Sequence, residues 1–353
     1  MKTVVVGGGI IGASVAYHLA TYGADVTVFT GGRRGGIGTA VSFAWINAAP
    51  GYARNYFELR LMAILDWHRL QHELGKNLEI NWSGSLWWED EIVAMKDAVT
   101  LQASWGYPIR IISAAEAAEQ EPSLCQYPPK SSLSTLEGSL APLQTGVTLL
   151  AAAVAKGATI RDDTVCSIIT KNGHVRGVRT ESGDTKADHV VLAAGIASEQ
   201  LAADIGVILP MANLPGLLAY SEPLPPLLRG VILSPRIHMR QNTEGRIVVG
   251  QDFGGTSLSD NPQMAAESLM TTVRALLINR NDLRLAYFTQ GIRPIPSDGL
   301  PIMGPTSKLF GLYVTVMHSG VTLAALAGRL AAEEIMTGCS IDILAPFRPD
   351  RFT

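Results

Sequence analysis

The beginning of the chain constrains its fold most, because a short β-branched run passes there into a glycine turn and an apolar stretch. The run covers residues 3–6, and Gly7, Gly9 and Gly12 follow with the spacing Gly-x-Gly-x-x-Gly. The first glycine permits a tight turn, the second lets a pyrophosphate approach the backbone, and the third lets helix and strand pack closely. The helix would offer free N–H groups and the positive end of its dipole to the phosphates. With a second apolar strand at residues 25–29, the pattern predicts a Rossmann-like dinucleotide site.

The residue that follows the second strand leaves the identity of the dinucleotide open. In such sites an Asp or Glu about 20 residues after the glycines binds the adenosine ribose hydroxyls, whereas this chain has Thr30. The Thr30 hydroxyl can make one hydrogen bond to the ribose but carries no charge. Arg33 and Arg34 follow directly and fit either the 2′-phosphate of NADP or a solvated basic loop, of which we favour the loop.

The composition describes a globular chain with a large core. The 353 residues are 47% hydrophobic and 17% charged and carry a formal net charge of −3. This length suffices for two domains, or for one α/β body with an inserted lobe. The sequence shows no basic block, so no nucleic-acid partner is expected. Residues 312–328 are the most apolar later stretch, but His318, Ser319 and Gly320 interrupt them, so no transmembrane segment is expected. Loose attachment to a membrane surface stays open.

The cysteines and histidines give no sign of a disulfide framework or a metal site. Cys125, Cys166 and Cys339 are far apart and odd in number, which favours a reducing, cytoplasmic location. His68 and His72 are four residues apart on a predicted helix but lack an HExxH pattern and a third ligand. No metal is therefore expected.

The middle of the chain alternates predicted helices with strands. A small, hydroxyl-rich stretch at residues 39–48 suits backbone that lies against a cofactor. Residues 52–74 form an amphipathic helix that Gly75 ends. The uninterrupted apolar strand at residues 189–195 is typical of the middle of a parallel sheet.

A second strand-rich stretch covers residues 211–290 and contains a pair of basic side chains. His238 and Arg240 are two residues apart on a predicted strand, so they share one face of the sheet. Their side chains either lie on a polar outer face of the sheet or, if that face lines a cavity, contact a substrate.

The last segment builds a second helix N-terminus at a strand end. Residues 291–304 are punctuated by proline and glycine, which predicts an ordered loop. A strand at residues 311–316, a turn at 317–320 and a helix at 321–337 follow, with Ser319 as the N-cap. Such a helix end can stabilise negative charge that lies close to it.

Together these segments resemble the flavoenzyme family of D-amino-acid oxidase, glycine oxidase and sarcosine oxidase. The resemblance covers nearly the whole chain. It is carried by Gly-Gly-Gly-Ile-Ile-Gly at residues 7–12, the strand at 190–195, Gly-Ile-Arg-Pro at 291–294 with Asp-Gly-Leu-Pro at 298–301, and Met-His-Ser-Gly at 317–320. The stretch at 291–304 is far more specific than the glycine turn, and it implies FAD in place of NADP.

The resemblance also implies how the chain is divided. The implied fold class is α/β, with a Rossmann-like FAD-binding domain interleaved with a mixed-sheet α+β substrate domain. The FAD-binding domain would comprise residues 1–75, 136–210 and 291–353, and the substrate domain residues 76–135 and 211–290.

Position by position, the resemblance assigns residues to the cofactor. Ser42 and the residues up to Asn47 would run along the flavin, and Val165 would meet the adenine through its backbone. The first turn of the last helix would face the pyrimidine end of the ring. The full set of implied FAD contacts is Gly7, Gly9, Gly12, Thr30, Ser42, Val165, Gly195, Ser319, Gly320, Val321 and Thr322.

The implied activity is oxidation of a D-amino acid or of a secondary amine, N-substituted or cyclic, that carries a carboxylate. Hydride would leave the substrate for the flavin, and the imine would hydrolyse. Arg293 matches the position that holds the substrate carboxylate, which suits the planar fork of a guanidinium; its structural alternative is an ion pair that anchors a loop. His318, His238 and Arg240 complete the catalytic candidates.

The chain departs from the family pattern at several positions. Thr30 replaces the usual ribose-binding acid, and His238 stands where a tyrosine is common. The branch that attaches its flavin covalently uses a cysteine near residues 291–294, and none is present here, so non-covalent FAD is expected.

Three functions besides that of a free-standing oxidase stay open. The chain fits the flavin subunit of an opine- or hydroxyproline-type dehydrogenase that passes electrons to a partner subunit. The electron acceptor also stays open: it is oxygen, a quinone or a partner subunit. The chain also fits a flavin-binding protein without turnover and, less well, an NADP-dependent reductase.

Overall fold

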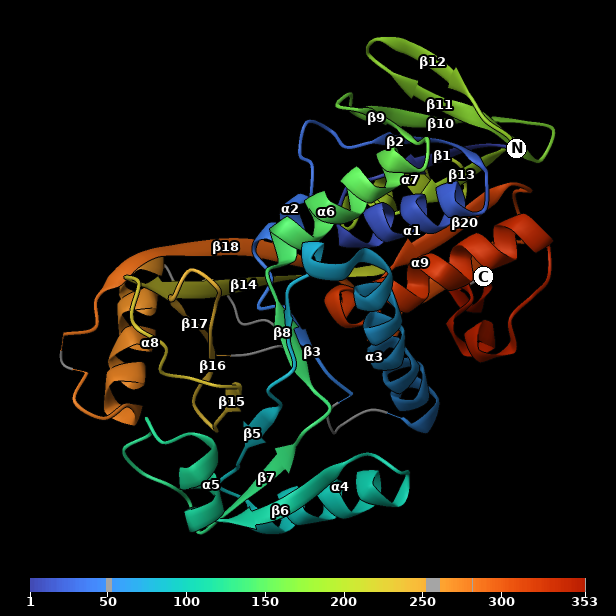
Figure 1. Cartoon of the computed structure of the whole chain (residues 1–353). Coiled ribbons are helices and arrows are strands. Elements are labelled where there is room, and N and C mark those ends of the chain that lie inside the picture. Colours follow the sequence, from blue (N-terminus) through green and yellow to red (C-terminus); the bar gives the residue numbers. More distant parts are fainter. Residues whose placement is uncertain (49–52, 252–260, 281, 353) are drawn as a thin grey trace.

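A parallel β-sheet and a mixed β-sheet organise the fold, as the computed structural model shows (Figure 1). The structure describes residues 1–48, 53–251, 261–280 and 282–352. The parallel sheet has the spatial order β9-β2-β1-β13-β20-β19, and β19 alone runs antiparallel to its neighbour among these described strands. Its strands are β1 (Lys2–Val6), β2 (Asp25–Phe29), β9 (Thr159–Arg161), β13 (His189–Leu192), β19 (Ile302–Pro305) and β20 (Leu312–Val316).

Alternating side chains of β1 pack on opposite faces of the parallel sheet. Val5 joins a core with helices α1 (Ile10–Thr21), α3 (Arg54–Leu74), α6 (Pro142–Ala155) and α9 (Gly320–Thr337). Val4 and Val6 face a second core, formed with β10 (Val165–Lys171), β11 (His174–Thr180) and α7 (Ala197–Ala203). The strand β12 (Gly183–Lys186) extends this antiparallel layer. The period-2 pattern of β1 therefore produces three layers, with helices on one face and a small sheet on the other.

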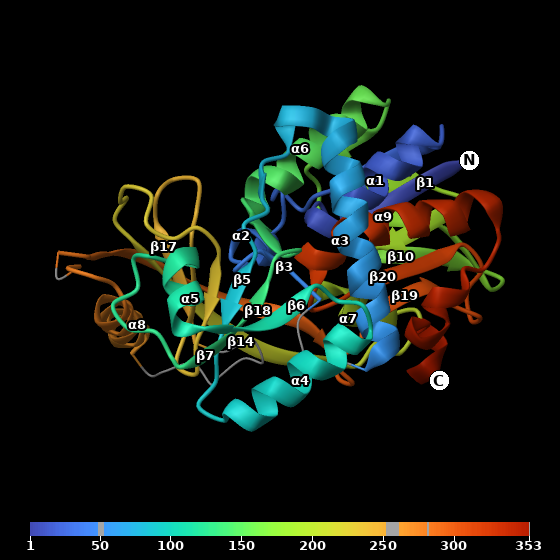
Figure 2. The same ribbon diagram turned by 60° about the horizontal axis from the view of Figure 1, so that its bottom comes forward.

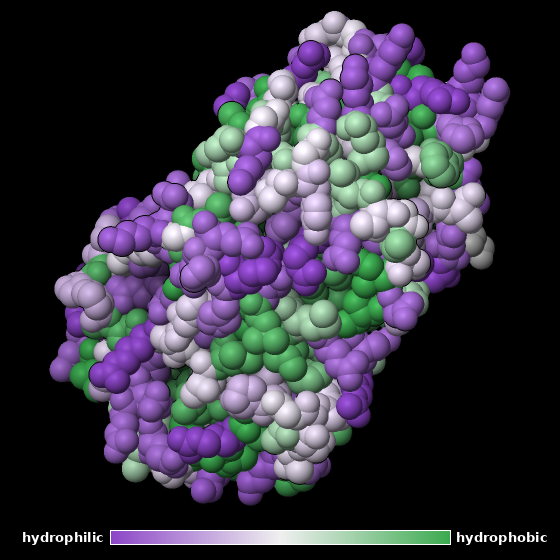
Figure 3. All heavy atoms as spheres, turned by 45° about the vertical axis from the view of Figure 1, so that its right-hand side comes forward, coloured by the Kyte–Doolittle hydropathy of each residue, from purple (hydrophilic) through white to green (hydrophobic). Residues whose placement is uncertain are grey.

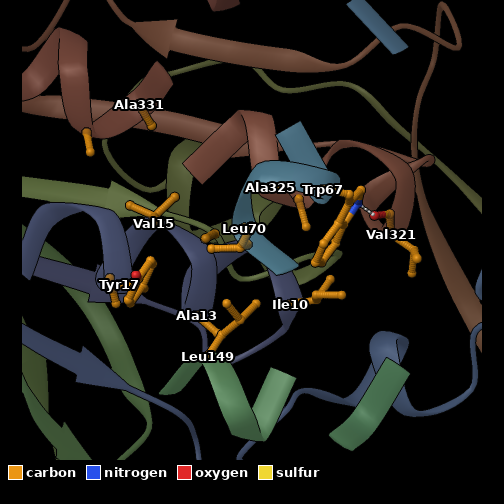
Figure 4. Close-up of a cluster of buried hydrophobic side chains, with 14 of the residues drawn as sticks. Ile10, Ala13, Val15, Tyr17, Trp67, Leu70, Leu149, Val321, Ala325 and Ala331 are labelled. Carbon is orange, nitrogen blue, oxygen red and sulfur yellow. Dashed lines mark hydrogen bonds between the residues drawn. The ribbon is translucent and has the colours of Figure 1, made fainter. Parts of the chain in front are cut away.

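The helical layer is held by close contacts between α1, α3 and α9 (Figure 2). Trp67 of α3 is buried, and its Nε1 donates to the carbonyl oxygens of Val321 and Thr322 at 3.0 Å each (Figure 4). This tryptophan ties α3 to the first turn of α9. Gly328 of α9 lies against Ser14 of α1: a Cβ added to Gly328 would be 2.6 Å from the Ser14 carbonyl carbon. The two helices therefore approach each other as closely as a glycine allows.

The mixed sheet has the order β18-β14-β17-β16-β15-β5-β7-β6. The helix α8 (Pro262–Leu276) covers one face, and a smaller cluster around Phe43 lies on the other. The strands are β5 (Ser85–Trp87), β6 (Ile109–Ser113), β7 (Lys130–Ser134), β14 (Met211–Ser221), β15 (Val231–Leu233), β16 (His238–Gln241), β17 (Ile247–Gly250) and β18 (Leu285–Pro296).

Shorter elements join these layers. A small sheet in the order β3-β8-β4 lies between the larger ones, formed by β3 (Trp45–Ile46), β4 (Ile80–Asn81) and β8 (Gly138–Leu140). The remaining helices are α2 (Ile37–Ala40), α4 (Ile92–Ser104), α5 (Ala114–Gln120) and the 3-10 turns Gly75–Asn77, Asp342–Phe347 and Pro349–Phe352. On the face shown in Figure 3, hydrophobic residues gather near the middle, and hydrophilic ones cover most of the rest.

The structure confirms the α/β fold class and corrects the predicted loop. The strand at residues 25–29 is β2, and the last helix ends where predicted, at Gly338 with φ 70°. The loop predicted at residues 291–304 is wrong: residues 291–296 continue β18, and most of the remainder is the turn into β19 and that strand itself. Proline misled the prediction because β18 is the edge strand of its sheet, where a missing N–H breaks no ladder.

The predicted division into domains stays a prediction. The strand β18 crosses the expected boundary between residues 290 and 291. Of the helix expected at residues 52–74, the structure shows Arg54–Leu74, with Ala53 as the extended N-cap residue; residue 52 lies outside the described ranges.

Candidate active site

A cavity of about 490 Å³ lies between the mixed sheet and the N-terminal end of α9. Its walls come from several segments that are far apart in sequence. They include Ser42, Phe43, Ala44, Trp45 and Asn47 around β3, Gly216, His238 and Arg293 on the mixed sheet, and His318, Ser319, Val321 and Thr322 around the start of α9.

The segment from Ser42 to Asn47 is held against the first turn of α9. The Ser42 Oγ accepts from the Ala44 N–H at 3.1 Å, in a turn where Ala44 has φ 59°. Left-handed backbone at a non-glycine residue is strained and typical of functional sites. Thr322 Oγ1 donates to the Trp45 carbonyl oxygen at 3.1 Å and accepts from the Asn47 N–H at 3.3 Å. Two regions assigned separately to the flavin are thus joined directly.

A buried arginine that the sequence analysis missed stands at the same place. Arg60 of α3 is 2% exposed, and its Nε donates to the Asn47 carbonyl oxygen at 3.0 Å, while its Nη2 donates to the side chain of Asn47. Its Nη1 donates to Ser319 Oγ at 2.8 Å. Ser319 is the N-cap residue of α9 as predicted, but its side chain makes no capping bond. Arg60 thus adds a full positive charge to the end of the helix dipole.

The sequence did contain a signal for Arg60. It lies in the apolar stripe of α3, three residues after Phe57 and four before Ile64, both of which are buried. An arginine on the buried face of an amphipathic helix needs partners, and those partners are the cavity residues.

Arg293 and His238 lie together on the cavity face of the mixed sheet. Arg293 lies over Gly216 of the neighbouring strand, because a Cβ added there would be 2.7 Å from its Nε. His238 is 3% exposed and packs edge-on against the Phe43 ring, with ring centroids 4.5 Å apart. Burial, together with the charge of Arg293, lowers the pKa of His238 to about 3. His238 is therefore neutral at physiological pH.

Arg240 is not among the residues that line this cavity, and its role as a catalytic candidate stays a prediction. Its Nε donates to the Phe43 carbonyl oxygen at 2.5 Å and its Nη2 to the Leu140 carbonyl oxygen at 3.3 Å. Two residues along a strand move a side chain about 6.6 Å, which takes Arg240 past the cavity that His238 lines. Arg240 instead positions the backbone of Phe43. The expectation of a polar outer face is wrong, since both side chains are buried.

A buried carboxylate, that of Glu137, holds Trp45 in the cavity wall. Glu137 accepts hydrogen bonds from Trp45 Nε1 at 2.8 Å and from the Tyr107 hydroxyl at 2.5 Å. It is fully enclosed, and burial raises its pKa. Nothing in the sequence indicated this group, because its partners come from distant segments.

The glycine turn has the geometry of a phosphate site. Gly7 has φ 113°, and a Cβ there would be 2.7 Å from the Ala193 carbonyl carbon. A Cβ on Gly12 would be 3.0 Å from the Gly7 carbonyl carbon, and closer still to its oxygen. Helix α1 begins after Gly9 without a side-chain cap hydrogen bond at that residue. The Ile10 N–H donates to Thr39 Oγ1 at 3.1 Å, and the N–H groups that follow it lie at the carboxyl edge of the parallel sheet, which fits a pyrophosphate.

Other cofactor candidates border this edge. Gly195, with φ 59°, follows β13, and Val165 begins β10 a few residues after β9 ends. Thr30 is buried at the end of β2, and its Oγ1 donates to Asp162 Oδ1 at 2.8 Å. The roles of these residues toward FAD stay predictions.

The described ranges contain neither a metal cluster nor a membrane-spanning helix. No group of three or more His, Cys, Asp or Glu side chains in these ranges is arranged to hold a metal ion. None of the described helices is both long and apolar enough to span a bilayer.

Comparisons with known proteins agree with this geometry. Residues 2–334 match the family model described as FAD dependent oxidoreductase, DAO. The chain is 25% identical to glycine oxidase of Bacillus subtilis strain 168, over 99% of this chain and 97% of that protein. It is 26% identical to an opine oxidase subunit of Agrobacterium tumefaciens strain Ach5, over 99% and 96%. The solved glycine oxidase of Geobacillus kaustophilus superposes with a TM-score of 0.89 at 22% identity, over 98% of each chain.

Proposed function

Because this chain belongs to the DAO family of FAD dependent oxidoreductases, we propose that it oxidises an amino acid or secondary amine whose carboxylate binds Arg293. Family membership also decides in favour of FAD over the NADP that Thr30 and Arg34 had left open. The substrates named for the relatives, glycine and opines, belong to those proteins. For this chain they support a carboxylate-bearing amine.

One observation carries the proposal: Arg293 lines the same cavity as the Ser42–Asn47 segment and the start of α9. A guanidinium binds a carboxylate through two parallel hydrogen bonds, which fixes orientation as well as position. A substrate held in this way keeps its amine-bearing carbon at a defined place in the cavity. The cavity is thus suited to an amino acid more than to a simple amine.

The other residues of the cavity have defined electrostatic roles. His238 stays neutral, so it does not repel a substrate amine that arrives protonated. Arg60 and the N-terminus of α9 create positive potential at the far side, where negative charge would be stabilised. When bound, non-covalent FAD accepts the hydride that leaves the substrate carbon, and water hydrolyses the resulting imine.

The electron acceptor defines a second candidate function. Similarity to an opine oxidase subunit over nearly the whole chain favours a flavin subunit that passes electrons to a partner. Slow reaction of the reduced protein with oxygen, together with fast reduction of a quinone, would support the partner-dependent form. Fast reaction with oxygen would support an oxidase.

The proposal is tested by anaerobic flavin bleaching in wild type and Arg293→Ala. The ligands are a panel of D-amino acids, N-methyl and cyclic amino acids, and the same amines without their carboxylates. Wild type should bleach with carboxylate-bearing members, and Arg293→Ala should lose most of the preference for them over the amines. The control is Arg110→Ala. Arg110 is an exposed arginine on β6, the other edge strand of the mixed sheet, and it forms an ion pair with Glu116. Retention of the full preference by Arg293→Ala would exclude the proposed anchor.

A further inference from the structure

We propose that Asp162, directly after the strand beside β2, supplies the carboxylate that binds the adenosine ribose of FAD, in place of the acid that Thr30 replaces. The inference rests on the FAD assignment and is independent of which amine is oxidised.

The pairing of strands places Asp162 next to Thr30. The strands β2 and β9 are parallel neighbours, and Phe29 pairs with Arg161 at their ends. Thr30 and Asp162 are the residues that directly follow these strands, and the Thr30 N–H donates to the Arg161 carbonyl oxygen at 2.9 Å. The carboxylate that Thr30 lacks is therefore present at the end of the neighbouring strand, and neighbouring strands are about 4.8 Å apart.

The Asp162 side chain is oriented by three hydrogen bonds. Its Oδ1 accepts from Thr30 Oγ1 at 2.8 Å and from Arg34 Nε at 3.0 Å, and its Oδ2 accepts from Arg34 Nη2 at 2.8 Å. A carboxylate offers about four acceptor positions, so one position on Oδ2 is left for a hydroxyl. The side chain is 51% exposed, which leaves it accessible to a ligand. The bonds from Arg34 and Thr30 also lower the pKa of Asp162, which keeps it ionised.

The site is continuous with the glycine turn. A Cβ added to Gly8 would be 2.8 Å from Thr30 Cγ2, and the Gly35 N–H donates to the Gly8 carbonyl oxygen at 2.9 Å. The methyl group of Thr30 therefore packs on the turn while its hydroxyl is directed to Asp162. The neighbouring Asp163 is used elsewhere, since its Oδ1 accepts from Ser182.

The pairing also explains the selection of the cofactor. Arg34 is engaged by both Asp162 oxygens, so its charge is compensated at the place where a 2′-phosphate would bind. The carboxylate would repel such a phosphate but accept from a ribose hydroxyl. The arrangement fits the unphosphorylated ribose of FAD.

The test compares FAD with an analogue whose adenosine ribose lacks both hydroxyls. Dissociation constants are measured by fluorescence quenching on the full chain after FAD removal, without substrate. Wild type should prefer FAD by about 10- to 100-fold, the range for hydrogen bonds to charged groups. In Asp162→Ala the preference should fall below about threefold. Asp162→Asn serves as the second variant if the alanine variant does not fold.

Two further variants separate ribose binding from a loop tether. Arg34→Ala releases the loop but keeps the carboxylate, so it should weaken both ligands and retain the preference. Asp184→Ala removes an equally exposed bidentate partner of Arg179 and should change neither ligand. Equal weakening of FAD and the analogue by Asp162→Ala, or an undiminished preference, would overturn the inference. Failure of amine oxidation would leave these binding data unaffected.

Discussion

Gly328→Ala tests how tightly the last helix packs on the helix of the glycine turn. A Cβ on Gly328 would lie 2.6 Å from the Ser14 carbonyl carbon and 2.8 Å from Ser14 Cβ, and closer still to Ser14 Oγ. Carbon atoms in contact need roughly 3.5 to 4.0 Å, so α1 and α9 must separate by about 1 Å. Overpacking of this kind costs about 1 to 3 kcal/mol, and a backbone contact places it near the upper value.

The intrinsic effect of the substitution runs in the opposite direction. Alanine is favoured over glycine within a helix by about 1 kcal/mol. The expected net destabilisation is therefore about 2 kcal/mol. With an unfolding entropy of about 2.1 cal/mol/K per residue over 353 residues, this corresponds to a fall in Tm of about 3 °C.

Thermal melting followed by near-UV circular dichroism measures this shift. Gly38→Ala is the matched control, because Gly38 is also helical and a Cβ there meets nothing within 4 Å. It should leave Tm unchanged or raise it slightly. Ser14→Ala should not rescue Gly328→Ala, since the Ser14 backbone remains in the way. An unchanged Tm in Gly328→Ala, or full rescue, would refute the packing argument.

Two further predictions concern buried charge. The pKa of His238 is about 3 in the folded protein, below its ordinary value of 6.5. Between these two pH values the unfolded chain binds more protons than the folded protein. The free energy of unfolding therefore falls as the pH drops from 6.5 toward 3. Urea denaturation should therefore show a smaller loss of stability from pH 7 to pH 5 in His238→Gln than in wild type; equal losses would contradict the assignment. Arg348→Met should cost about 3 to 5 kcal/mol in the same assay, because it leaves the buried Glu334 without its cation. The exposed pair of Arg54 and Glu58 provides the control, and Arg54→Met should change stability little; a similar loss in both variants would refute the reasoning.

Local pattern predicted the elements that carry their own signals. The alternation of valines in β1 and the glycine turn after it are visible within ten residues, and both agree with the structure. The edge position of β18 is not local, because it depends on which strands pair. Pro294 and Pro296 therefore read as a loop although they lie in a strand.

The candidate site was predictable only where a family motif marks it. Arg293 and His318 belong to such motifs, and both line the cavity. The approach of Asp162 to Thr30 depends on the register of β2 with β9, across more than 130 residues of chain. Residue spacing carries no information on such a contact.

The late position of β20 in the sequence determines when the parallel sheet can be completed during synthesis. The strand β20 borders β13, and α9 packs on α1, yet both elements come more than 280 residues after the glycine turn. At 5 to 20 residues per second, roughly 15 to 60 s separate the emergence of the turn from that of its last supports. Until then one edge of β13 is open, and α1 packs on α6 without α9. The nascent chain therefore exposes that edge of β13 until β20 has emerged and paired with it.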